Sequence, residues 1–411
     1  MKKAISVIIS CTMLLFLLYP ISSNAQIKRP AIKNEGEAVN VTAAVDTRME
    51  LNSPSAVLIE GSTGMVIFDK NKDERLKPAS ITKIMTLLLI FEALDAGKIK
   101  LTDEVSVSEH AASMGGSQVY LEPNETQDVN TMIKCISIAS ANDACVAMAE
   151  FIAGSEEEFV AMMNKRAKEL GMNNTHFVNC CGLDTDNHYS SAYDVALMSR
   201  ELIMKHPQIS NYSTVWMDTI THTTKKGKTE FGLTNTNKLV RFYQGITGLK
   251  TGSTGLAKYC LSASAKRNNM DLIAVIMAAP ETKTRFMEAS KLLNYGFANY
   301  SIYTDDNADT VLSPVKVAKG VLDSVKGKVG NKFSYLCIKG RTPEDIRKEI
   351  VLYEQVPAPV AENEKIGEIV YYYDNDKIGS VDILASEKID QATYKDYFIK
   401  LLKRYFIGPK V

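Results

Sequence analysis

The stretch from Pro78 to Gly97 limits the possible folds most, because it is apolar on nearly every side of a predicted helix. Its apolar residues are Ile81, Ile84, Met85, Leu87, Leu88, Leu89, Ile90, Phe91 and Leu94. A helix that is apolar all round is buried, and Pro78 suits its first turn. The rest of the chain must therefore form layers around this helix. The chain has 411 residues, 45% of them hydrophobic, which is enough for such a core and predicts two or three domains.

Strand patterns lie before and after this helix in the sequence. They predict a hairpin, with Glu60-Gly61-Ser62-Thr63-Gly64 as its turn, and a later strand pair, at residues 56–59, 65–69, 259–265 and 272–279. Helical patterns lie at residues 130–170, 190–205 and 282–297. Strands with a block of helices inserted between them predict an α/β (α+β) sandwich in which helices flank an antiparallel sheet.

The sequence changes character after about residue 305. Short β-type stretches separated by Gly, Pro and Asn or Asp turns occur at residues 311–317, 333–338, 350–353, 366–373 and 378–384. They predict a small all-β domain over residues 304–386.

The last segment, residues 387–411, has the pattern of an amphipathic helix. One face carries Tyr394, Tyr397, Phe398, Leu401, Leu402, Tyr405 and Phe406. The rest carries Lys395, Lys400, Lys403 and Arg404. Because this helix is too short and too charged to span a bilayer, we expect it to anchor the protein on the membrane surface. Packing on the β domain is the alternative.

The first residues have the pattern of a signal peptide. Lys2 and Lys3 precede an apolar stretch at residues 4–21, and the small residues of Ser23-Asn24-Ala25 follow. A membrane-spanning anchor is the alternative, but the strongly apolar part is short for one. We therefore expect residues 1–25 to be removed and residues 26–52 to form a polar lead-in. The protein would then be exported and peripheral on the outer face of the cytoplasmic membrane.

Charge and cysteine content argue against nucleic-acid binding, a disulfide framework and a metal site. Lys plus Arg and Asp plus Glu balance at 48 each, with no basic stripe, so nucleic acid is not an expected partner. The cysteines after residue 25 are too sparse for a disulfide framework, and we expect mostly buried thiols at Cys135, Cys145, Cys180, Cys181, Cys260 and Cys337. His176 and His188 lie near Cys180-Cys181, but no metal-binding spacing accompanies them. We expect no metal and no cofactor.

Ser80 and Lys83 are three residues apart at the start of the central helix, which puts their side chains on one face. A serine hydroxyl needs a base to become a nucleophile, and a lysine can serve when burial or a neighbouring cation lowers its pKa. The pattern alone is weak, because Ser313-Pro314-Val315-Lys316 repeats it. Ser140-Ala141-Asn142 and Lys250-Thr251-Gly252 follow in the chain, and the three motifs together predict a serine hydrolase site.

With their flanking residues, these motifs resemble the penicillin-binding proteins, most closely the low-molecular-mass D-alanyl-D-alanine carboxypeptidases of serine peptidase family S11. The resemblance is carried by residues 77–86, Gly115-Gly116-Ser117-Gln118, Ser140-Ala141-Asn142-Asp143-Ala144, Asn174-Thr175-His176-Phe177, His188-Tyr189-Ser190-Ser191-Ala192 and Gly248-Leu249-Lys250-Thr251-Gly252. It implies a catalytic domain over residues 53–303 with a five-stranded antiparallel sheet and an inserted all-helical part. A β-rich domain and an anchor helix would follow.

The resemblance also implies roles for the reacting groups. Ser80 would attack the carbonyl of the penultimate D-alanine of a peptidoglycan stem peptide, with Lys83 as general base. Ser140 would pass a proton to the leaving amine, and water would then hydrolyse the acyl-enzyme. β-Lactam antibiotics would acylate the same serine as covalent inhibitors.

The remaining roles belong to substrate binding. They fall on Asn142, Lys250, Thr251, Gly252, Ser253 and Arg285. Asn142 would hold the peptide, Lys250 and Thr251 would bind the terminal carboxylate, and the N–H groups of Ser80 and Ser253 would form the oxyanion hole. Two residues depart from the family pattern: Ser253 stands where histidine or an aromatic residue is common, and Ala141 where glycine is common. Neither removes a reacting group.

Two other functions compete with this interpretation. A secreted class A β-lactamase shares the motifs but needs a glutamate for deacylation. Glu169 precedes Leu170-Gly171-Met172-Asn173 and is better interpreted as a helix end, and the β-rich domain has no counterpart there. A non-catalytic cell-wall binding protein is the other alternative, against which the intact serines and lysines argue.

Overall fold

The computed structural model describes residues 49–225, 227–338 and 341–407. The predicted signal peptide and most of the predicted lead-in lie outside them. The described residues form two compact units. One runs as far as Asp305 and includes Phe333–Arg347, and the other contains Asp306–Lys332 and the chain from Lys348 onward. No helix within the described ranges is both long enough and apolar enough to cross a bilayer.

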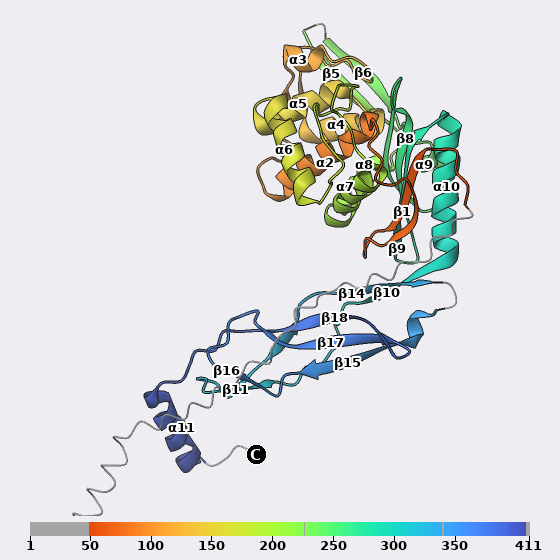
Figure 1. The fold of residues 1–411 in the computed structure, drawn as a ribbon. Helices are drawn as coiled ribbons and strands as arrows, with labels where there is room; N and C mark the ends of the chain where they lie inside the picture. Colours follow the sequence, from red (N-terminus) through yellow and green to blue (C-terminus); the bar gives the residue numbers. More distant parts are fainter. Residues whose placement is uncertain (1–48, 226, 339–340, 408–411) are drawn as a thin grey trace, which may run out of the picture. The chain divides into compact units, whose positions relative to one another are not determined.

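The first unit is built on a five-stranded antiparallel sheet with the strand order β2-β1-β9-β8-β7 (Figure 1). Its strands are β1 (Ser55–Glu60), β2 (Val66–Lys70), β7 (Ile246–Thr254), β8 (Lys258–Arg267) and β9 (Met270–Ala279). The sheet confirms the predicted fold class. Val57 of β1 pairs with Val275 of β9, so strands from the two ends of this unit lie side by side.

Both faces of the sheet are buried. On β1, Val57 and Ile59 belong to one apolar core and Leu58 belongs to the other. The first core contains the helical block, whereas the second contains α10 (Thr282–Asn299), which lies along the opposite face in Figure 1. Burial on both faces explains why β9 is a nearly continuous apolar run.

The helical block lies between β2 and β7 in the chain. Its elements are η1 (Ala79–Thr82), α2 (Lys83–Asp95), α3 (Glu109–Ala112), α4 (Val129–Lys134), the π-helix η2 (Cys135–Ala139), α5 (Asn142–Ala153), α6 (Glu156–Glu169), α7 (Ala192–Lys205), η3 (Pro207–Ile209), α8 (Ser210–Ser213) and α9 (Leu239–Phe242). Two small antiparallel strand pairs accompany it: β3 (Glu104–Ser106) with β4 (Thr126–Asp128), which α3 separates in the chain, and the hairpin of β5 (Met217–Thr224) with β6 (Gly227–Thr234).

Helix α2 is the buried central helix that the sequence predicts, since every residue from Lys83 to Phe91 is buried. Its start differs from the prediction. The helix does not begin at Pro78 but follows a 3-10 turn, because Ala79 has a φ of 48°, in the left-handed region that an α-helix cannot contain. Ser80 therefore lies in a tight turn ahead of the α-helix proper, whereas Lys83 is its first residue.

The second unit is formed by β-strands and ends in a helix. Its strands are β11 (Val315–Ala318), β12 (Ser324–Val325), β13 (Gly327–Val329), β15 (Ile346–Leu352, from Lys348 onward), β16 (Gln355–Pro357), β17 (Lys365–Tyr373) and β18 (Asp376–Ala385), with α11 (Tyr394–Ile407) at the end. The short helix η4 (Pro343–Asp345), which precedes β15, belongs to the first unit. The predicted stretch 333–338 is strand β14 (Phe333–Ile338), but it pairs with β10 (Tyr300–Asp305) in the first unit. The remaining predicted β-stretches lie in the second unit.

Candidate active site

Ser80 lies where η1 meets the strand β7. The backbone of Gly252 packs against this turn so closely that a Cβ there would lie 2.9 Å from Pro78 O, Ser80 N and Ile81 N. Glycine is therefore required at position 252 for β7 to approach the backbone N–H of Ser80. The approach brings the Lys-Thr-Gly motif next to the Ser-x-x-Lys motif.

Lys83 is fully buried and makes three polar contacts through Nζ. Nζ lies 3.0 Å from Ser80 Oγ and 2.6 Å from Asn142 Oδ1. It also donates to the backbone carbonyl of Cys181 at 2.8 Å. The lysine and the serine are thus within proton-transfer distance, and the lysine is screened from solvent. The sequence motifs give no indication of the third contact, because it uses a backbone atom.

The second motif follows the π-helix η2. This helix ends at Ala139, the next residue, Ser140, caps it with a φ of 64°, and α5 begins at Asn142. The Asn142 side chain is fixed at both ends, because Oδ1 accepts from Lys83 while Nδ2 donates to Gly115 O at 2.6 Å. Ser140 and Asn142 are both buried.

Lys250 is also fully buried, and its Nζ donates to Thr251 O at 3.1 Å. Burial, reinforced by the positive charge of Lys83, holds the pKa of Lys250 well below its usual value. Thr251 donates from Oγ1 to Thr236 Oγ1 at 2.6 Å, so a second hydroxyl lies beside the Lys-Thr-Gly motif. Thr236 was not among the residues that the sequence singled out.

Ser253 lies near the end of β7, and Arg285 of α10 contacts the same part of this strand. Arg285 Nη1 donates to the carbonyls of Gly252 and Cys260 at 2.9 and 3.2 Å, so this guanidinium holds the backbone of β7 and β8 together. Burial lowers the pKa of Arg285. Ser253 is exposed on β7, opposite Tyr259 of β8. Across the described ranges, no group of three or more His, Cys, Asp and Glu side chains could hold a metal ion.

His188 contacts the nucleophile turn through the side chain of Thr82. Its Nδ1 accepts from the Val178 N–H at 3.0 Å, which leaves the ring proton on Nε2, 2.9 Å from Thr82 Oγ1. The ring is buried, and burial lowers the pKa of His188 to about 4. Both nitrogens are matched to the neutral ring, because a second ring proton would face the Val178 N–H.

This neutral histidine makes the catalytic unit sensitive to acid. Between pH 6.5 and pH 4 the unfolded chain binds the His188 proton and the folded chain does not, so the free energy of unfolding falls as the pH falls. The expected loss is roughly 3 kcal/mol by about pH 4. The test compares urea unfolding of wild type and His188→Gln at pH 7 and pH 4, followed by fluorescence of Trp216, the single tryptophan. Equal acid losses in the two proteins would contradict this assignment.

Comparisons with known proteins agree with this architecture. Residues 40–281 match the D-alanyl-D-alanine carboxypeptidase family (peptidase S11), and residues 300–391 match the C-terminal domain of penicillin-binding protein 5. The chain is 47% identical over 350 residues to the D-alanyl-D-alanine carboxypeptidase DacF of Bacillus subtilis (strain 168), covering 85% of this chain and 88% of that protein. It is 33% identical over 383 residues to DacA of Escherichia coli (strain K12), covering 90% and 91%.

Solved structures give the same result. The crystal structure of penicillin binding protein 5 from Haemophilus influenzae matches with a TM-score of 0.72 and 32% identity, covering 84% of this chain and 99% of that chain. These matches confirm the resemblance that the motifs indicate. The chain therefore belongs to the D-alanyl-D-alanine carboxypeptidase family, peptidase S11.

Proposed function

We propose that this D-alanyl-D-alanine carboxypeptidase removes the terminal D-alanine from peptidoglycan stem peptides through an acyl-enzyme on Ser80. The observation that carries the proposal is the 3.0 Å separation of Ser80 Oγ and Lys83 Nζ, with Asn142 Oδ1 fixing the lysine. A serine nucleophile with a lysine base requires this short distance and a desolvated lysine, and Lys83 is fully buried.

The proposed reaction has two stages. Ser80 Oγ attacks the carbonyl carbon of the penultimate D-alanine while Lys83 Nζ accepts the hydroxyl proton. The oxyanion that forms is stabilised by the N–H groups of Ser80 and Ser253. The C–N bond then breaks, the leaving D-alanine amine receives a proton through Ser140, and water hydrolyses the Ser80 ester in the second stage.

In this proposal, residues of β7 select substrates that have a free C-terminal carboxylate. Lys250 is close enough to Lys83 for its charge to act on it, and the hydroxyl of Thr251 lies beside that of Thr236. A protonated Lys250 supplies the positive charge that a terminal carboxylate needs. Since the pKa of Lys250 lies well below its usual value, this charge is lost as the pH rises, and carboxylate binding weakens on the alkaline side.

One experiment tests the proposed function. The purified protein is incubated with a fluorescent penicillin and, separately, with a peptide ending in D-Ala-D-Ala, with Ser80→Ala as the control. Stable labelling and D-alanine release, both abolished in Ser80→Ala, are expected. Rapid turnover of the penicillin without D-alanine release would indicate a β-lactamase, and absence of labelling would indicate a non-catalytic binding protein.

We further propose that α11 attaches the protein to a membrane surface, as a peripheral protein on the outer face of the cytoplasmic membrane. Its aromatic residues are strongly exposed: Tyr394 at 95%, Tyr405 at 84% and Phe406 at 76%. On another side of the helix, Lys400 donates to Gly320 O at 2.9 Å and pairs with Asp323, which ties α11 to the β-strand unit. An exposed aromatic face beside basic residues suits the interface between headgroups and acyl chains.

A chain that ends at Lys388 is expected to lose its membrane association. The reason is that the deleted residues carry the exposed apolar face, which supplies the burial energy for interfacial binding. Fractionation of cells into membrane and soluble parts measures the effect, and the double variant Tyr405→Ser, Phe406→Ser retains the helix while reducing its apolar face. The idea is wrong if the shortened chain remains with the membranes as fully as the intact chain does.

A further inference from the structure

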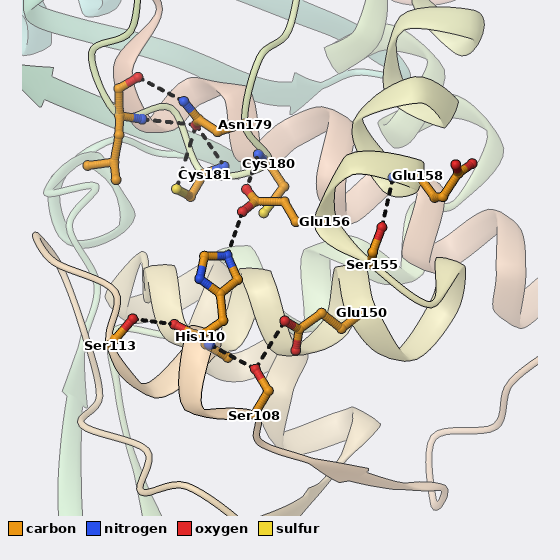
Figure 2. A network of polar contacts seen from close by, with 12 residues as sticks. Ser108, His110, Ser113, Glu150, Ser155, Glu156, Glu158, Asn179, Cys180 and Cys181 are labelled. Atoms are coloured by element: carbon orange, nitrogen blue, oxygen red, sulfur yellow. Dashed lines mark hydrogen bonds and ion pairs between the residues drawn. The ribbon is translucent and has the colours of Figure 1, made fainter.

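The loop from Asn179 to Leu183 is organised by a single side chain (Figure 2). Asn179 Oδ1 accepts from the N–H groups of Gly182 at 2.7 Å, Leu183 at 3.1 Å and Cys181 at 3.3 Å. Its Nδ2 donates to Leu183 O at 3.0 Å. One amide therefore satisfies four backbone groups, which fixes the direction of the carbonyl groups in this turn.

This turn presents a backbone carbonyl to the catalytic centre. Cys181 O accepts from Lys83 Nζ at 2.8 Å, and Cys180 O accepts from Thr86 Oγ1 at 2.6 Å. Two consecutive carbonyls of the loop thus bind two side chains one turn apart on α2. Any rotation of the turn would move an acceptor away from Lys83.

The loop also packs directly against the turn that carries Ser80. Gly182 has a φ of 88°, and a Cβ at this position would lie 1.9 Å from Ala79 O. Backbone thus contacts backbone without an intervening side chain, so the loop cannot shift toward η1. A displacement of Cys181 O can only increase its distance from the lysine or rotate it.

A residue outside the loop, Glu156, fixes the start of the loop. The N–H of Cys180 donates to Glu156 Oε1 at 3.0 Å, and Glu156 Oε2 pairs with His110 Nε2 at 3.1 Å, as Figure 2 shows. Glu156 is in the first turn of α6, and its side chain is only 14% exposed. The Glu156 contact fixes one end of the turn, while Asn179 determines its shape.

From these contacts we propose that Asn179 is a positioning residue for the general base. By shaping the turn at residues 180–183, it places Cys181 O so that Lys83 Nζ is held between this carbonyl, Asn142 Oδ1 and Ser80 Oγ. Asn179 does not touch the reacting atoms. The inference rests on the proposed function of Lys83 and assigns it a third fixed acceptor that the family motifs do not contain.

The test separates the acylation step from binding. In Asn179→Ala, the saturating rate constant for acylation by a fluorescent penicillin is expected to fall roughly 10- to 100-fold, because a slightly displaced base transfers protons poorly. The half-saturating concentration should stay within about twofold, because the groups on β7 that hold the ligand carboxylate are unaffected. The final amount of bound label should still reach one per chain, which shows that the site is folded.

Asn164 offers a matched control. Its side chain clamps the same segment two residues earlier, with Oδ1 accepting from the Phe177 N–H at 2.9 Å and Nδ2 donating to Phe177 O at 2.8 Å. It makes no hydrogen bond to the turn at residues 180–183 that contacts Lys83. Asn164→Ala is therefore expected to lose thermal stability while its saturating acylation rate remains near that of wild type.

The proposal is overturned if Asn179→Ala acylates at the wild-type rate, or if both alanine variants slow acylation equally. Should Asn179→Ala fail to fold, Asn179→Asp and Asn179→Ser replace it. The aspartate carboxylate still accepts from the three N–H groups, whereas the shorter serine does not replace these contacts. The proposal then requires Asn179→Asp to be acylated faster than folded Asn179→Ser. Absence of labelling in the wild type would instead refute the proposed function itself, so the two failures are distinguishable.

Discussion

Lys83→Met is expected to slow acylation of Ser80 by roughly 10²–10⁴-fold, the usual contribution of a positioned general base. Lys83 is fully buried, and the proposed mechanism has no other base beside Ser80 Oγ. Methionine has a similar length and no charge, so the packing of α2 is kept and no buried cation is left unpaired. The measurement is the rate of labelling by a fluorescent penicillin, with folding followed by thermal unfolding.

Lys77→Met is the matched control for this change. Lys77 lies three residues before Ser80, as Lys83 lies three residues after it, and its Nζ donates to Thr185 O in an exposed position. Its replacement should leave the labelling rate within a few-fold of wild type. Equal rates for Lys83→Met and wild type would show that another group activates Ser80.

Gly252→Val is expected to reduce acylation by at least about 100-fold, since it acts on the proposed oxyanion hole. The valine Cβ would start 2.9 Å from Ser80 N and Pro78 O, so either β7 or the nucleophile turn must move. Both movements separate Ser80 N–H from the Ser253 N–H and from the groups that bind the carboxylate. Stopped-flow acylation and D-alanine release should decline together.

A glycine in the next turn provides the comparison. At Gly255 an added Cβ would meet nothing within 4 Å. Gly255→Val should therefore acylate like wild type, which separates close approach at Ser80 from a general effect of stiffening the β7–β8 turn. If Gly252→Val retained the wild-type rate, the packing of β7 on the nucleophile turn would have no role in catalysis.

Much of the fold could be predicted because its signals are local. The β1–β2 hairpin has turn residues between two apolar runs, α2 is apolar all round, and α10 follows a simple helical period. Strand β14 shows the limit of such signals. Its residues 333–338 match the predicted stretch, but alternation along a strand does not identify the partner, which is β10.

The side chains of the candidate site could also be proposed from the sequence, whereas its backbone contributions could not. The residue pairs Ser80 with Lys83 and Ser140 with Asn142 have recognisable spacing. Cys181 contributes a carbonyl, which every residue type carries, so no side-chain pattern marks it. The left-handed φ of Ala79 and of Ser140 is equally invisible, because neither residue type favours that region and tertiary packing imposes it.

The order of strands in the central sheet has a consequence for biosynthesis. Strand β1 is made first but pairs with β9, and Val57 cannot meet Val275 until more than half of the chain has been synthesised. Closing such a long loop is slow, because its entropy must be lost before the pairing compensates for it. A nascent chain that stops before β9 has an unpaired edge on β1 and lacks a strand against which α7 packs. Such chains are candidates for chaperones and for aggregation, and the strands β7 and β8 that contact the nucleophile turn are also made long after it.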